Sequence, residues 1–110
     1  MQKLVNYHSN LTHGTVFWFP GSYPHEKYVD LMLVEFPDSD RKFGLVVSTG
    51  HKAGLILIKL PKEAESNHFA GIDRQWVIDN WNKWIYETCN VDDVYVIQNY
   101  PIPVIDYSKP

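Results

Sequence analysis

Four β-rich runs, separated by turn sequences, fill most of the first half of the chain and constrain the fold more than any other feature. Pro20-Gly21, residues 37–40 (PDSD) and residues 49–53 (TGHKA) have the residue types and lengths of short turns. Strands joined by short connections run antiparallel, because a parallel neighbour needs a crossover of about a dozen residues or more. The sequence therefore predicts an antiparallel meander, with strands at residues 14–20, 28–36, 43–48 and 54–60.

One amphipathic helix is predicted after these strands. Asp73 is a suitable N-cap, and at about 100° per residue the next apolar positions fall within an arc of roughly 120°. This apolar stripe consists of Val77, Ile78, Trp81, Trp84, Ile85 and Thr88. We expect Trp81 and Trp84 to lie between the helix and the sheet. Trp76 falls about 80° outside the stripe, so the sequence leaves open whether residues 62–71 or the C-terminal tail cover it, or whether it is exposed.

The end of the chain returns to β structure at residues 94–97 and then becomes irregular at its prolines. We expect three tail residues to pin this segment against the body: Tyr100, Ile102 and Ile105. Gly44 and Gly54 are placed to mark bulges or bends that curl the sheet toward a barrel. The predicted fold is α+β: a single domain over residues 1–110, with a curved antiparallel sheet of about five or six strands and one main amphipathic helix packed on it.

The composition indicates a soluble protein of the cytoplasm. Hydrophobic residues make up 45% of the 110 positions, which suffices for the core of one domain. The single cysteine, Cys89, excludes an intramolecular disulfide and fits a reducing compartment. The N-terminus lacks an apolar region of signal-peptide length, and no segment approaches the roughly 20 apolar residues of a membrane span. We therefore expect a cytoplasmic location and no membrane contact.

The charge of the chain argues against direct binding of nucleic acid. The formal net charge is −3 and the pI is about 5.9. Free-standing nucleic-acid binders usually carry a basic stripe, whereas the lysines and arginines here are mostly single along the sequence. Acidic residues do group locally. A weakly acidic surface suits a basic protein partner, although it suits plain solubility equally well.

The chain contains no recognisable catalytic or metal-binding motif. Its five histidines include no pair at the i, i+4 spacing of a helical metal site, and neither HExxH nor Cys-x-x-Cys is present. A turn histidine such as His51 is typically solvated, and a lone cysteine at a helix end, such as Cys89, is typically a small buried hydrophobe. We therefore expect no metal, no cofactor and no enzymatic activity, which favours a binding protein.

Seven residues are candidates for contact with a protein partner. They combine acidic turns with aromatic side chains, and they lie on turns, on the long loop and outside the apolar stripe of the helix. Loops tolerate variation without unfolding the scaffold, so partner choice can be tuned there. The candidates are Asp38, Asp40, Glu63, Glu65, His68, Phe69 and Trp76.

Three stretches of the chain carry a resemblance to a known family. They are GLVVSTGHKAGLILIKLP (residues 44–61), IDRQWVIDNWNKWIY (residues 72–86) and VDDVYVIQNYPIP (residues 91–103). These stretches resemble bacterial immunity proteins of polymorphic-toxin systems, which include contact-dependent growth inhibition. The resemblance implies a small cytoplasmic antidote that binds a cognate toxin domain, often a nuclease such as an RNase, and blocks its active site. It carries over no catalytic or contact residues, so the seven candidates come from this sequence alone.

Two other classes of function stay open. A strongly curved meander rich in aromatic residues is also typical of an SH3-like adaptor, which binds a proline-rich or extended peptide in an aromatic groove. The other class is a small hydrolase or a cofactor-dependent enzyme, and turnover lost on changing His51 or Cys89 would support it.

Overall fold

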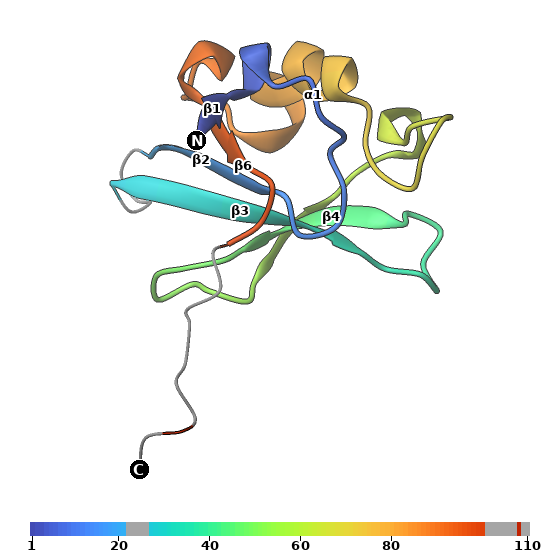
Figure 1. Ribbon diagram of the computed structural model, residues 1–110, viewed down its shortest axis with the longest axis horizontal. Helices are drawn as coiled ribbons and strands as arrows, with labels where there is room; N and C mark the ends of the chain where they lie inside the picture. The colour runs from blue at the N-terminus through green and yellow to red at the C-terminus, as the bar shows by residue number, and fades with distance from the viewer. Residues whose placement is uncertain (22–26, 101–107, 109–110) are drawn as a thin grey trace.

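The computed structural model describes residues 1–21, 27–100 and 108, which form one antiparallel sheet of six strands with a helical layer on one face (Figure 1). The strands are β1 (Gln2–Lys3), β2 (Val16–Pro20), β3 (Tyr28–Glu35), β4 (Phe43–Val47), β5 (Ile56–Lys59) and β6 (Tyr95–Ile97). Their order in space is β1-β6-β2-β3-β4-β5. The α+β class and the antiparallel sheet predicted from the sequence are confirmed.

The predicted meander is the run from β2 to β5, in which each strand pairs with the next one along the chain. β2 and β3 pair over their full overlap, from Val16↔Met32 to Pro20↔Tyr28. β6 arrives from the other end of the chain and pairs with the free side of β2, and β1 then pairs with β6. In the described part of the chain the sheet stays open, with β1 and β5 at its edges, so its curl does not close a barrel.

The helical layer begins at Asp73, as the sequence predicts. The Asp73 carboxylate accepts a hydrogen bond from the Trp76 N–H (3.0 Å) and so caps α1 (Arg74–Asn80). The helix continues as the π-helical segment η3 (Trp81–Ile85), where the Tyr86 N–H donates to the carbonyl of Trp81, five positions earlier (2.9 Å). The described 3-10 turns are η1 (Leu4–Asn6), η2 (Lys62–Ala64) and η4 (Val91–Asp93).

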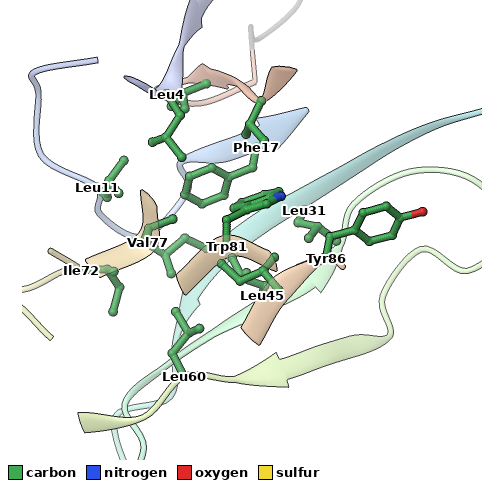
Figure 2. Packing of buried hydrophobic residues seen from close by; sticks show 14 of the residues in the cluster. Leu4, Leu11, Phe17, Leu31, Leu45, Leu60, Ile72, Val77, Trp81 and Tyr86 are labelled. Atoms are coloured by element: carbon green, nitrogen blue, oxygen red, sulfur yellow. The ribbon is translucent and has the colours of Figure 1, made fainter. Parts of the chain in front are cut away.

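Trp81 lies at the centre of the core, between the helical layer and β2 (Figure 2). Its side chain is 0% exposed, and its ring centroid lies 5.8 Å from that of Phe17 and 5.0 Å from that of Phe19. Among the described residues, its indole N–H has no hydrogen-bond partner. Trp81 therefore stabilises the fold through apolar packing, and its predicted place between helix and sheet is confirmed.

Trp84 is half-buried and packs against the core cluster, so the prediction that it lies between helix and sheet is confirmed only in part. The prediction used the α-helical advance throughout, whereas a π-helical turn closes its hydrogen bond over five residues instead of four. Tyr86, which is outside the predicted stripe, is buried beside Ile85 after this turn, and its ring contacts Phe19 (4.8 Å). Trp84 turns outward as a result, toward Trp76.

Gly44 lies in β4 where β5 approaches closely. A Cβ atom at Gly44 would lie 2.7 Å from the carbonyl oxygen of Ile58. The register between β4 and β5 shifts between Leu45 and Val46, one position further along, so the predicted irregularity is observed there. Gly54 ends the β4–β5 turn with φ of 93°, a backbone conformation that favours glycine.

Candidate functional site

The β3–β4 turn presents Asp38 and Asp40 to solvent at one end of the sheet. Two contacts hold this turn against β5. The Lys59 ammonium lies 5.0 Å from the centre of the Phe36 ring, and it donates to the Ser39 hydroxyl at 3.3 Å. A shallow open depression of about 350 Å³ is lined here by Phe36, Pro37, Asp38, Ser39 and Lys59. Both carboxylates are therefore accessible on a turn that is fixed in place.

Four further candidate residues lie on η2 and the loop after it: Glu63, Glu65, His68 and Phe69. The loop folds back on itself, because the Ser66 N–H donates to the Gly71 carbonyl (2.9 Å) and the Ser66 hydroxyl accepts from the His68 N–H (3.0 Å). Phe69 packs so close to Gly71 that a Cβ there would lie 2.6 Å from the ring. Glu63 and His68 are exposed, whereas Glu65 and Phe69 are half-buried.

Trp76 on α1 is half-buried. It is therefore neither fully covered nor fully exposed, the two alternatives that the sequence left open. Its ring centroid lies 6.0 Å from that of Trp84, with the two planes inclined at 53°. The outward turn of Trp84 in the π-helical segment makes this contact. Part of the Trp76 indole remains accessible to a partner.

The fold brings the candidate residues to one end of the molecule. β5 ends beside the β3–β4 turn, and η2 follows it after Leu60 and Pro61. The Asp73 N–H donates to the carbonyl of Ala64 (2.8 Å), which ties the start of α1, and with it Trp76, to η2. In Figure 1 the β3–β4 turn, η2 and the loop after η2 all lie on the right-hand side.

Cys89 is a buried thiol, 4% exposed. Burial raises its pKa, and the nearby Asp93 carboxylate raises it further, so the thiol stays protonated at neutral pH. The Asn82 amide donates to the carbonyl of Cys89 (2.6 Å).

The Nδ1 atom of His13 accepts a hydrogen bond from the Glu35 N–H (2.9 Å). In the described part of the chain, no three His, Cys, Asp or Glu side chains are grouped as a metal ion requires. None of the helices in these residues has the length and apolar character that a membrane crossing demands.

The edge strand β5 and the residue before it form a surface that the sequence analysis missed. Leu55, Ile56 and Leu57 are 58%, 52% and 41% exposed. The sequence predicts an ordinary strand at residues 54–60, although residues 55–58 are four consecutive apolar residues without a polar one between them. We call residues 55–57 the β5 edge.

Basic residues are concentrated in the part of the sequence that contains β4 and β5, mostly in the segments that flank the two strands. Residues 41–62 contain five of the ten lysines and arginines and none of the 13 aspartates and glutamates. The five are Arg41, Lys42, Lys52, Lys59 and Lys62. They stand mostly singly in the sequence, but strand pairing places them on one hairpin and its flanks. The rest of the chain keeps five basic residues and all 13 acidic ones, so the charge is strongly divided.

Asp30 on β3 is a buried carboxylate, 8% exposed, that the sequence analysis did not single out. It accepts hydrogen bonds from the hydroxyls of Thr49 and Tyr100, the latter at 2.6 Å. Burial raises the pKa of Tyr100 to about 12, and the hydrogen bond to Asp30 contributes to the shift. These contacts fix the start of the β4–β5 turn to β3, and Tyr100 pins the chain after β6 as expected. The expected contacts of Ile102 and Ile105 lie outside the described residues.

Comparison with known proteins adds one finding. A family model described as Immunity protein 45 matches residues 4–96. No curated protein sequence and no solved structure matches the chain. The matched range runs from η1 into β6, so it includes β2 to β5 and the whole helical layer. On this match, the chain belongs to the Immunity protein 45 family.

Proposed function

We propose that this protein is the antidote to one toxin: it binds the cognate toxin domain and blocks its active site without catalysing a reaction. The observation that carries this proposal is the family match over residues 4–96. The match agrees with the resemblance to immunity proteins of polymorphic-toxin systems, including those of contact-dependent growth inhibition. An antidote of this kind acts in the cytoplasm of the cell that makes it.

The partner we propose is a basic toxin domain, with a nuclease such as an RNase as the leading class. A nuclease needs a cationic cleft for its substrate. Outside residues 41–62, this chain carries 13 acidic residues against five basic ones, an excess whose sign is complementary to such a cleft. Opposite charges of this kind accelerate encounter and orient the two proteins.

The proposed contact surface is the end of the molecule that carries the seven candidate residues. Asp38, Asp40 and Glu63 are exposed there, on elements held by the contacts described above. Turns and loops that are already held in place lose little backbone freedom on binding, which favours affinity. Trp76 adds a partly accessible aromatic ring of the type that often anchors interfaces.

The proposal is tested by co-expression with the toxin domain encoded next to this gene. Cells that produce the toxin should survive only when this protein is present, and the purified pair should bind tightly in a titration. Absence of both protection and binding would contradict the proposal. Binding of a proline-rich peptide would then favour the SH3-like adaptor instead.

The acidic end is tested by reversing charge at Glu63 and Glu65 together, to Lys. Association should slow, and the dependence of its rate on salt should weaken, because the steering charge is lost. The same reversal at Asp92 and Asp93 in η4 is the matched control and should change association less. Equal effects of the two pairs would show that only total charge matters.

A further inference from the structure

The two edges of the sheet differ in the surface that they offer to another strand. β1 is two polar residues long, Gln2–Lys3, which is too short to template a partner. At the opposite edge, Leu55, Ile56 and Leu57 expose between 41% and 58% of their surface. Edge strands are ordinarily protected by charge or by irregular pairing, and an unprotected apolar edge indicates an interaction site.

The backbone of β5 reaches its free side after Leu55, whose own N–H and carbonyl are bonded to Lys52 and Val47. The Leu60 N–H donates to the carbonyl of Phe43 on β4 (2.8 Å). Backbone groups point to opposite sides at alternate residues of a strand, so those of Lys59 face away from β4. The Arg41 guanidinium donates to the Lys59 carbonyl (3.3 Å), in agreement with this direction.

The protection of β5 is limited to one half of the strand. Arg41 covers its C-terminal half by donating to the Lys59 carbonyl. At Leu57 the register changes from Leu45↔Ile58 to Val46↔Ile56, which leaves Leu57 without an opposite residue on β4. The open part of the edge is thus short and apolar, with Lys52 in the turn before it.

The charge of this region selects between two occupants of the edge. If two copies of this chain paired antiparallel through β5, Lys52 of each copy would lie near Lys59 and Lys62 of the other. Like charges placed opposite one another destabilise strand pairing. A foreign strand with carboxylates at its ends meets the same lysines favourably. The absence of any acidic residue from 41 to 62 makes this preference strong.

We propose that the β5 edge adds a strand of the cognate toxin domain to the sheet, an inference that rests on the proposed function. The added strand is apolar at its centre, where it meets Leu55, Ile56 and Leu57, and carries carboxylates at its ends. Main-chain hydrogen bonds supply affinity in this mode, and side chains supply specificity. Together with the acidic end beyond Lys59, the edge gives the toxin two contacts of opposite charge and therefore one orientation.

The test measures binding of the toxin domain encoded by the adjacent gene to three variants. Leu55→Thr with Leu57→Thr keeps side chains that favour strands but removes the apolar contact, and it should weaken binding by about tenfold or more. Lys52→Glu should weaken binding and slow association. Lys83→Glu makes the same charge change on η3, in the helical layer, and should bind like the wild type. Unchanged melting temperatures would show that all three variants fold.

The outcomes separate this inference from the function on which it rests. A wild-type protein that does not bind the toxin overturns the proposed function, and this inference with it. Tight binding by the wild type that the Leu55→Thr, Leu57→Thr variant retains overturns the inference alone. Light scattering measures the oligomeric state of the free protein. A wild-type protein that is dimeric, with a Leu55→Thr, Leu57→Thr variant that is monomeric, would assign the edge to a second copy and overturn the inference.

Discussion

β2 and β5 are both short apolar strands, yet they have opposite surroundings. β2 lies between β6 and β3, and Phe17 and Phe19 on it are at most 1% exposed beneath Trp81. β5 has one neighbour, β4, and its first residue, Ile56, is 52% exposed. The comparison teaches that apolar character alone does not decide burial. The position of a strand in the sheet and the helix above it decide whether its apolar side chains stabilise the fold or remain available to a partner.

The largest effect is expected at Trp81, which covers β2 from the helical layer. Trp81→Ala should lower the free energy of unfolding by about 3–5 kcal/mol, because it leaves a cavity beneath the helical layer. Trp81→Phe should cost less, since it fills more of the space and removes the unpaired indole N–H. Denaturant titration of both variants measures the difference. An Ala variant as stable as the wild type would contradict the central position of Trp81.

A smaller effect, on binding instead of folding, is expected at Trp76. Trp76→Ala should raise the dissociation rate of the toxin complex by an amount equivalent to about 2 kcal/mol or more, if the exposed part of the ring is an anchor. Surface plasmon resonance measures this rate. Thermal melting controls for lost packing against Trp84. A variant with a lower melting temperature and the wild-type dissociation rate would show that Trp76 stabilises the fold and does not anchor the toxin.

The smallest effect concerns the polar contacts that fix the β4–β5 turn to β3. Tyr100→Phe removes the hydroxyl that donates to Asp30, and at pH 7 it should cost about 1 kcal/mol, since Tyr100 is partly solvated. The pKa of Tyr100 is about 12 in the folded protein and about 10 in an unfolded chain. The folded state thus holds this proton more tightly, and the contribution is present below pH 10 and lost as the pH rises toward 12. Denaturant titrations across this pH range measure the difference in unfolding free energy between wild type and variant. A difference that stays constant would contradict the contribution assigned to the Tyr100 hydroxyl.

Much of the fold could be predicted because it depends on local signals. Short turns gave the meander from β2 to β5, and Asp73 gave the start of the helix. The π-helical turn could not be predicted, because it depends on how the end of the helix packs rather than on periodicity. Its consequence, the outward turn of Trp84, was missed for the same reason.

The candidate site was only partly accessible to sequence reasoning. The acidic turns are visible as local groups, and the fold does bring them to one end. The β5 edge could not be recognised because edge position is a property of the whole sheet: it depends on β6 pairing with β2 and not with β5. The basic residues are likewise spread over 22 positions of the sequence, and only strand pairing brings Arg41 beside Lys59.

The central claim is that the toxin binds at the β5 edge. Hydrogen–deuterium exchange of the free protein and of its toxin complex tests it most directly, because one measurement compares both edges of the sheet and the helical layer. We predict that toxin slows amide exchange at the β5 edge, residues 55–57, whose free side would gain a strand. We predict no change at Gln2 and Lys3 on the opposite edge, nor at Val77 on the buried face of α1. Protection confined to the β1 edge or the helical layer, with β5 unchanged in a tight complex, would contradict the account.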